Sequence, residues 1–216
     1  GNLNNDIGLP LMLLRMSGNH RAAVIEMGMN RPGEIGYLTQ LARPTVALVN
    51  NAQRAHLQGM GSVNEVAREK GAIYDRLAAD GVAVINADDA FAGYWKAINA
   101  GRRTLTFGLS AGADVTARCT IHGFASDVAL TSPQGDTNFR LQVPGQHNVR
   151  NALAAAAACL AAGISLAAVA EGLGGYTGTA GRLHLRKGAG GAVLIDDSYN
   201  ANPDSMRAGI AVLAAT

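Results

Sequence analysis

Three short runs of consecutive aliphatic residues stand in the first half of the chain, and each is followed by polar or glycine residues and then by a helical pattern. They are RAAVIEM at 21–27, TVALVN at 45–50 and GVAVIN at 81–86. Continuous rather than alternating hydrophobicity is typical of strands that are covered on both faces. The pattern therefore predicts an α/β fold in which a parallel sheet is flanked by helices.

Helical periodicity fills the intervals between these runs, approximately over 33–42, 62–79 and 88–100. The middle segment has the clearest signals, because Ser62 suits the N-cap and Glu65 stands at the capping-box position. Gly81 follows its expected end, where glycine is favoured.

The pattern changes from about 103 to 143, where polar and apolar residues alternate around Pro133 and Gly135. Such alternation predicts a small antiparallel meander attached to the parallel sheet. An alanine-rich pattern at 148–173 then predicts a pair of helices.

A glycine-rich stretch at 172–182 is expected to lead into a hinge, and a further strand at 191–196 and a helix at 203–214 follow it. We therefore expect a first domain over residues 1–183. Residues 184–216 are expected to be the first βα unit of a second domain.

Composition adds mainly exclusions. Charged residues make up 16% of the chain and the formal net charge is +2, so nothing in the charge indicates a nucleic-acid partner. Cys119 and Cys159 lack CxxC spacing and are expected to be reduced core residues. The longest apolar stretch is mostly alanine and falls short of a membrane span, and no signal peptide opens the sequence. We expect a cytoplasmic protein without membrane insertion.

An unusual polar cluster follows the last predicted strand, in the sequence DDSYNANP at 196–203. A simple turn needs one Asp or Asn and a Gly, whereas this segment has two carboxylates, a phenol and two amides. The cluster indicates a site for a ligand with hydroxyl groups and a ring.

Three further residues could bind a metal. Glu26 ends the first aliphatic run, where open α/β sheets bind ligands, and the alternative is a capping or solvated acid. His56 follows the second run and could instead be an ordinary hydrogen-bonding histidine. Lys70 shares a helix face with apolar residues, so it is either a surface lysine with a buried stem or a desolvated amine. A neutral amine can react with CO₂ to give a carbamate, which is an oxygen ligand for metals.

Other polar residues have both structural and functional readings. Asn148 is expected to be the N-cap of the alanine-rich helix, whereas Asn151 in its first turn has no such reason to be polar. Arg182, beside a glycine near the hinge, could reach a phosphate or be a surface arginine. The sequence contains no GxxxxGK[ST] motif, so the phosphate loop of any nucleotide site is not in this chain.

Taken together, these motifs resemble the Mur ligases of peptidoglycan synthesis, in order and roughly in spacing. The stretches that carry the resemblance are GNLNNDIGLP, VIEMGMNRPGEI, VNNAQRAHLQGMGS, AREKGAIY, PGQHNVRNALAA, GRL and IDDSYNANPDSM. The forms NNDIGLP, GEI and DDSYNANP are similar to those of the branch that adds a dipeptide. The resemblance implies a P-loop NTPase-like central domain and the start of a Rossmann-like C-terminal domain.

The activity implied by the resemblance is that of an ATP-dependent amide ligase. It would join D-Ala-D-Ala to UDP-N-acetylmuramoyl-tripeptide through an acyl phosphate, with two Mg²⁺ ions neutralising the crowded negative charge. The resemblance also implies a monomeric enzyme.

The resemblance assigns roles to matching residues. Glu26, His56 and a carbamylated Lys70 would bind metal, the last two also serving catalysis, and Asn5 or Asp6 would lie beside the reacting groups. The implied nucleotide-binding residues are Asn148 and Asn151 near the adenine, Arg182 at the γ-phosphate, Asp197 on the ribose side, and Tyr199 and Asn200 flanking the nucleotide.

The chain departs from the family pattern at both ends. Family members place a strand and a GKT loop before the GNLNND segment and have a complete C-terminal domain. We therefore expect a fragment that alone binds ATP poorly and ligates nothing, with an open position at the edge of its sheet. Two alternatives stay open: a folylpolyglutamate synthetase-like ligase, and a non-catalytic nucleotide-binding module, which predicts loss of metal-binding residues that this sequence retains.

Overall fold

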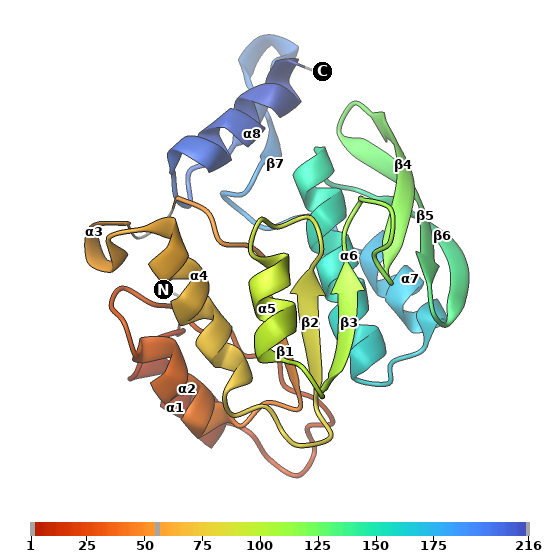
Figure 1. The fold of residues 1–216 in the computed structure, drawn as a ribbon. Helices are drawn as coiled ribbons and strands as arrows, with labels where there is room; N and C mark the ends of the chain where they lie inside the picture. The colour runs from red at the N-terminus through yellow and green to blue at the C-terminus, as the bar shows by residue number, and fades with distance from the viewer. Residues whose placement is uncertain (1–2, 55–56, 215–216) are drawn as a thin grey trace. The chain divides into compact units, whose positions relative to one another are not determined.

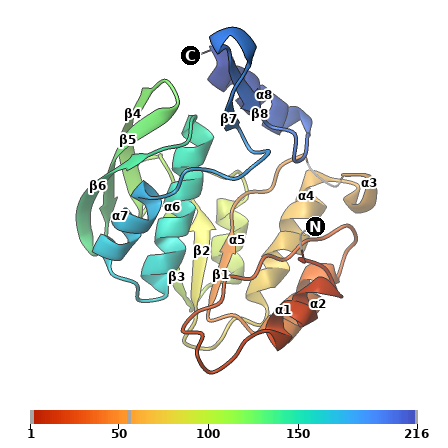
Figure 2. The same ribbon diagram turned by 180° about the vertical axis from the view of Figure 1, so that it is seen from behind.

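The computed structural model describes residues 3–54 and 57–214. The chain divides into two compact units, residues 1–105 and 106–216, which are called the first and second unit below. Figure 1 and Figure 2 show their elements from opposite sides. This division does not test the domain boundary expected near residue 183, which stays a prediction.

The first unit contains a sheet with the strand order β1-β2-β3. β1 and β2 are parallel, with Val46 opposite Val82 and Val49 opposite Ile85, and every residue of β2 is buried. The predicted parallel sheet with helices is therefore confirmed. The elements are α1 (Gly8–Leu14), α2 (Glu34–Ala42), β1 (Val46–Val49), α3 (Leu57–Met60), α4 (Val63–Gly71), a 3₁₀ turn (Ala72–Tyr74), β2 (Val82–Asn86), α5 (Ala92–Ile98) and β3 (Arg103–Phe107), in which the division between the units falls.

Two large aromatic side chains anchor the core of the first unit. Trp95 and Tyr74 are both fully buried. Each places its polar atom on a backbone carbonyl: the Trp95 Nε1 donates to Ala67 at 3.0 Å, and the Tyr74 hydroxyl donates to Val84 at 2.9 Å. Burial is thus achieved without an unpaired polar group on either ring.

Helix α4 begins as predicted but ends early. Its N-cap is Ser62, whose hydroxyl accepts from the Glu65 N–H at 3.2 Å. The expectation that the helix reaches residue 79 is wrong, because the chain tightens into a 3₁₀ turn at Ala72–Tyr74 and the Ala78 N–H then donates to Pro44.

The first aliphatic run, 21–27, does not form a strand, so that prediction is wrong. Val24 in its middle is 99% exposed. A strand needs a hydrogen-bonded neighbour, and in the described part of the chain the sheet β1-β2-β3 does not include this run. A hydrophobic run indicates that its residues favour burial. It does not specify the neighbouring strand that would bury them.

The second unit contains the predicted meander and helix pair. Strands β4, β5 and β6 form an antiparallel sheet in sequence order, and β3 belongs to the parallel sheet instead. The side chains of β5 alternate strictly between buried and exposed positions towards its end, as expected for a sheet with one solvated face. The elements are β4 (Thr116–His122), β5 (Ala125–Ser132), β6 (Gly135–Leu141), α6 (Gln146–Ala161), α7 (Leu166–Gly174), β7 (His184–Lys187), a 3₁₀ turn (Ala189–Gly191), β8 (Val193–Asp196) and α8 (Pro203–Ala214).

The last segment of the second unit is a hairpin followed by a helix. The predicted strand is β8, and it pairs antiparallel with β7, which the pattern did not predict. Helix α8 begins at Pro203, as expected from the preference of proline for the first turn. Among the described residues, no helix has the length and apolar character needed to cross a membrane.

Candidate functional site

A pocket of about 760 Å³ in the first unit brings together four of the predicted site residues. It is lined by the segment before α1, the irregular segment after residue 25, the start of α2 and one side chain from α4. The predicted residues among its lining are Asn5, Asp6, Glu26 and Lys70. His56 lies outside the described residues.

Glu26 is held in this pocket by a residue that the sequence did not single out. The Asn4 Nδ2 donates to a Glu26 carboxylate oxygen at 3.0 Å, and the Gly28 N–H donates to the Asn4 carbonyl at 2.8 Å. A Cβ on Gly28 would come within 2.8 Å of the Asn4 side chain, so a larger residue there would displace the amide that contacts Glu26. The run of asparagines at the start of the sequence was the available signal for Asn4.

Asn5 and Asp6 differ in what their side chains do. The Asn5 side-chain oxygen accepts from the Gly8 N–H at 2.8 Å and its carbonyl accepts from the Leu9 N–H at 2.9 Å, so Asn5 fixes the turn that leads into α1. Asp6 is exposed and lines the pocket. These bonds explain why position 5 is polar without a ligand, whereas the choice between Asn5 and Asp6 as the residue beside the reacting groups stays a prediction.

The Lys70 side chain points its amine at the backbone rather than at solvent. The Nζ donates to the Asn51 carbonyl at 2.6 Å. Burial lowers the pKa of this amine, and the nearby negative charge of Asp89 opposes that shift. A lysine in this environment gives up its proton more readily than one at the surface, as carbamate formation requires.

The start of α2 forms one wall of the pocket. The Glu69 carboxylate, only 8% exposed, accepts from the Gly33 and Ile35 N–H groups, each at 2.8 Å. Glu34 accepts from the Asn30 and Arg31 N–H groups, and these bonds, that of Asn30 foremost, lower its pKa. Glu69 thus pairs N–H groups at the start of α2, where anions are favoured, and Glu34 pairs those of the turn before it.

The donor atoms of the pocket fit Mg²⁺ in type. Carboxylate and amide oxygens are the ligands that Mg²⁺ prefers, and it usually keeps water or phosphate oxygens in its remaining positions. Within residues 3–54 and 57–214, no group of three or more His, Cys, Asp and Glu side chains is close enough to hold a metal unaided. A metal bound by Glu26 and a carbamate on Lys70 would therefore need further ligands. Oxygen atoms of the substrate phosphates could supply them.

The second unit holds the predicted nucleotide-binding residues. The Arg182 guanidinium lies over the Tyr199 ring, 4.3 Å from its centre, and the Tyr199 N–H donates to the Gly181 carbonyl at 3.0 Å. A cation above an aromatic face is held by the ring quadrupole. The arginine is thereby oriented, and its donors remain available at the surface.

Two more residues of the polar cluster pair with backbone groups. The Asp197 carboxylate accepts from the Leu183 N–H at 3.1 Å, and the Asn200 side-chain oxygen accepts from the next N–H at 2.8 Å. Asp196 accepts from Ser198 and pairs with Arg186, and these contacts, that of the Ser198 hydroxyl first, lower its pKa.

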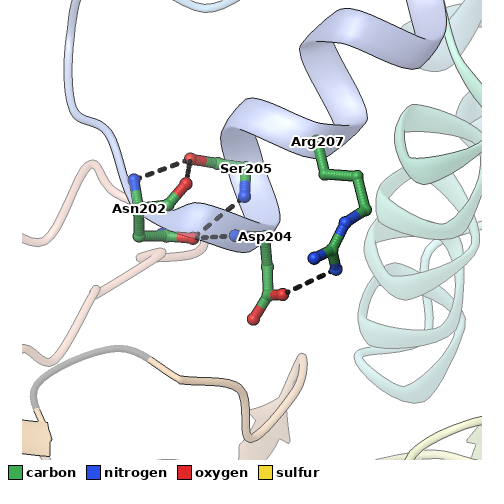
Figure 3. A network of polar contacts seen from close by, with 4 residues as sticks. All are labelled: Asn202, Asp204, Ser205 and Arg207. Carbon is green, nitrogen blue, oxygen red and sulfur yellow. Dashed lines mark hydrogen bonds and ion pairs between the residues drawn. The ribbon is translucent and has the colours of Figure 1, made fainter.

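Asn202 has a purely local role, shown in Figure 3. Its side-chain oxygen accepts from the Asp204 and Ser205 N–H groups at 3.0 and 2.9 Å, and the Ser205 hydroxyl accepts from the Asn202 N–H at 3.0 Å. This reciprocal arrangement caps the start of α8. Part of the unusual polar cluster is therefore explained by helix capping rather than by a ligand.

The two asparagines of α6 lie one turn apart in its first turns. The expectation that Asn148 is the N-cap is wrong: the helix begins at Gln146 after Gly145, whose φ of 90° is a left-handed conformation that glycine adopts freely. The Asn148 Nδ2 donates to the Pro144 carbonyl at 2.7 Å, and the Asn151 Nδ2 contacts the Asn148 side-chain oxygen at 3.4 Å.

His147, in the first turn of α6, was not predicted from the sequence as a site residue. Its burial lowers the pKa of the imidazole; the Asp197 carboxylate opposes the shift and Arg150 adds to it. A Cβ on Gly145 would come within 2.6 Å of the His147 ring, so the glycine also makes room for it. The imidazole is therefore an additional polar group between the start of α6 and the polar cluster of the second unit.

Comparison with known proteins identifies relatives over nearly the whole chain. A family model described as the Mur ligase middle domain matches residues 1–159. The UDP-N-acetylmuramoyl-tripeptide--D-alanyl-D-alanine ligase of Escherichia coli (strain K12) is 43% identical over 218 residues, which cover 99% of this chain and 48% of that protein. The chain thus spans about half the length of the curated relatives that it matches.

Solved structures agree in fold. The crystal structure of MurF from Acinetobacter baumannii matches with a TM-score of 0.96 at 39% identity, covering 100% of this chain and 47% of that one. MurF ligase from Thermotoga maritima, solved in complex with ADP, matches with a TM-score of 0.84 at 25% identity, covering 99% of this chain and 49% of the other.

Proposed function

The chain belongs to the Mur ligase family, and from that premise we propose that it forms the metal- and nucleotide-binding part of an ATP-dependent ligase that joins D-Ala-D-Ala to UDP-N-acetylmuramoyl-tripeptide. The observation that carries this proposal is the pocket that gathers Asp6, Glu26 and Lys70, in a chain 43% identical to such a ligase. The product would be a precursor of peptidoglycan.

In this proposal the first unit handles charge at the reacting groups. Mg²⁺, when bound, would neutralise the negative charge of phosphate and substrate carboxylate. Glu26 and His56 would bind it, and the Asn4 amide would keep the Glu26 carboxylate aimed into the pocket. The neutral amine of Lys70 would form an N–C bond with CO₂ and release a proton, which turns a cation into an oxygen ligand.

The second unit would bind the nucleotide. Asn148 and Asn151 present amides that suit the edge of an adenine, Asp197 would contact the ribose side, and Asn200 would flank the nucleotide. Arg182, oriented by the Tyr199 ring, would offer its donors to the terminal phosphate. ADP bound to the Thermotoga maritima relative supports this assignment.

The experiment is a ligation assay on the protein that carries this chain. ATP, Mg²⁺, UDP-N-acetylmuramoyl-tripeptide and D-Ala-D-Ala are supplied, and the pentapeptide product is measured by mass spectrometry beside phosphate release. We expect product with these substrates and none with folate and glutamate; the reverse result would establish the folylpolyglutamate synthetase-like alternative. The 216-residue chain alone, which has no GxxxxGK[ST] motif, is expected to form no product.

A further inference from the structure

Two side chains, Asn86 at the end of β2 and Asp89 in the turn after it, connect the turns that follow β1 and β2. The Asn86 Nδ2 donates to the Asn50 carbonyl at 2.7 Å. The Asp89 carboxylate accepts from the Ala52 N–H at 2.9 Å. These bonds join residues 36 and 37 positions apart in the sequence, so they fix one turn against the other.

The second polar atom of each side chain fixes its own turn. The other Asn86 atom, Oδ1, accepts from the Asp88 N–H at 2.9 Å, and the other Asp89 oxygen accepts from the Phe91 N–H at 2.9 Å. Asn86 is only 7% exposed. Both side chains are therefore held at two points, which leaves them little freedom to release the turn after β1.

The residue between the two bridged positions carries the acceptor for Lys70. Asn50 and Ala52 are pinned, and the carbonyl of Asn51 between them accepts from the Lys70 Nζ at 2.6 Å. The place of the amine is thus set by a backbone carbonyl that is fixed on either side. Asp89 is also the anion that acts on Lys70.

We propose that Asn86 and Asp89 are positioning residues for the ligase reaction, acting through the 50–52 turn to hold the amine of Lys70 in the pocket. The part of this inference that concerns the reaction rests on the proposed function, whereas the positioning itself does not. A rival explanation gives both side chains only the local task of shaping the turn before α5. The two differ in whether Lys70 responds when the side chains are removed.

The lysines of the sequence, Lys70, Lys96 and Lys187, provide a built-in comparison. Competitive acetylation with acetic anhydride, followed by peptide mass spectrometry, gives the labelling rate of Lys70 relative to the other two. Lys96 and Lys187 are exposed, so their rates serve as internal references for the reagent, whereas loss of fold would by itself raise the Lys70 rate. Circular dichroism of each variant checks the fold independently.

Asn86→Ala is the decisive variant because it removes a bridge without changing charge. We expect Lys70 labelling to rise roughly 2- to 10-fold, the factor that corresponds to losing one net hydrogen bond. Asp89→Ala is expected to raise it further, since it removes both a bridge and the neighbouring anion. The matched controls are Asn64→Ala and Asp80→Ala, which alter exposed residues of the same unit and should leave the Lys70 rate unchanged.

Amide hydrogen exchange at Ala52 provides a second readout in the same samples. Its N–H loses its acceptor in Asp89→Ala and is expected to exchange faster. Should an alanine variant lose its fold, Asp89→Asn keeps the shape and one acceptor, and the same changes are expected at smaller size. Unchanged labelling of Lys70 in folded variants, or unchanged protection of Ala52, would overturn the proposal.

The consequence for the reaction is tested separately in the ligation assay. Asn86→Ala should lower kcat more than it raises the KM for ATP, because it displaces a group beside the reacting atoms and touches no nucleotide residue. The labelling experiment needs no ligase activity. Failure of the proposed function would leave its result standing, and failure of positioning would leave the ligation result standing.

Discussion

The pocket around Lys70 and the polar cluster at 196–203 differ in how their polar side chains are held. Among the residues that support the pocket, the bonds reach across the sequence: Glu69 binds N–H groups 34 and 36 positions away, and Asn86 binds a carbonyl 36 positions away. The lining residues Asn5 and Glu34 bind N–H groups three or four positions away. In the cluster, Asn200 and Asn202 bind backbone groups one to three positions away. Long-range bonds hold a tertiary arrangement, whereas local bonds shape a turn.

The difference teaches which polar residues of a motif need a ligand to explain them. Local bonds account for Asn202 and for much of Asp196 and Asn200. Asp197 bonds to a residue 14 positions away, and Tyr199 stacks with Arg182. These last three remain the strongest nucleotide-binding candidates of the second unit.

Removing a long-range carboxylate should give the largest loss of stability. Glu69→Ala leaves two N–H groups at the start of α2 without their buried acceptor, and we expect a loss of about 2–4 kcal/mol in the free energy of unfolding. Denaturant unfolding measures it. Glu65→Ala is the control on the same helix, because Glu65 forms an exposed pair with Arg68; a cost as large as that of Glu69 would abolish the contrast between buried and surface carboxylates.

Removing a local cap should cost less. Asn202→Ala deprives the start of α8 of its side-chain acceptor, and we expect a loss of about 1 kcal/mol. Amide hydrogen exchange along α8 locates the effect. Asn200→Ala, which removes a single bond to the adjacent N–H, should leave α8 protected as before. Equal loss of protection in both variants would contradict the capping assignment.

Alkaline pH should report on the first unit. In the folded protein the pKa of Lys70 is lowered from its ordinary value of 10.5. At a pH between the folded pKa and 10.5, Lys70 is therefore more often protonated in the unfolded chain than in the folded one. Stability contributed by this group therefore rises as the pH rises towards 10.5. Lys70→Met should flatten that rise in urea titrations at successive pH values. The buried Tyr74, whose pKa is raised, acts equally in both proteins and cancels in the difference.

Acidic pH should report on the second unit. The pKa of His147 is lowered from 6.5 by burial, so the stability it contributes is present above 6.5 and is lost as the pH falls through the folded value. His147→Gln should weaken this loss below pH 6.5 and leave the alkaline side unchanged. If His147→Gln changed the stability at alkaline pH instead, His147 and Lys70 would not act in separate pH ranges.

The smallest effect is expected where a buried polar group lacks a partner. The Ser126 hydroxyl, fully buried in β5, has no hydrogen-bond partner in the part of the chain that the structure describes. Ser126→Ala should be neutral or stabilising by up to about 1 kcal/mol in thermal unfolding. Ser132→Ala is the matched control and should destabilise, because that hydroxyl donates to Gly135 and accepts from Gln134.

The sequence predicted those elements whose signals are local. Ser62 and Glu65 mark the start of α4, Pro203 marks the start of α8, and the alternation along β5 marks the meander. The strand expected at 21–27 failed because strand formation depends on a neighbour that the run does not specify. The same limit explains why β7 was missed.

The sequence predicted the reactive side chains of the candidate site but not the residues that hold them in place. Glu26 and Lys70 stand out by type and position, and they lie in one pocket. Asn4, Asn86 and Glu69 were missed because their partners are 22 to 36 positions away, which no local pattern reveals. The polar residues just after the second and third aliphatic runs were the available signal, since the ends of adjacent parallel strands meet at one edge.

The most direct test of the central claim is the activity of Lys70→Ala in the protein that carries this chain. We predict that ligation of D-Ala-D-Ala to UDP-N-acetylmuramoyl-tripeptide falls by at least about 100-fold, as expected when a metal-binding oxygen is lost. Added formate or acetate should restore part of the rate by replacing the carbamate oxygens. An unchanged rate in Lys70→Ala would contradict the account and return Lys70 to the role of an ordinary lysine with a buried stem.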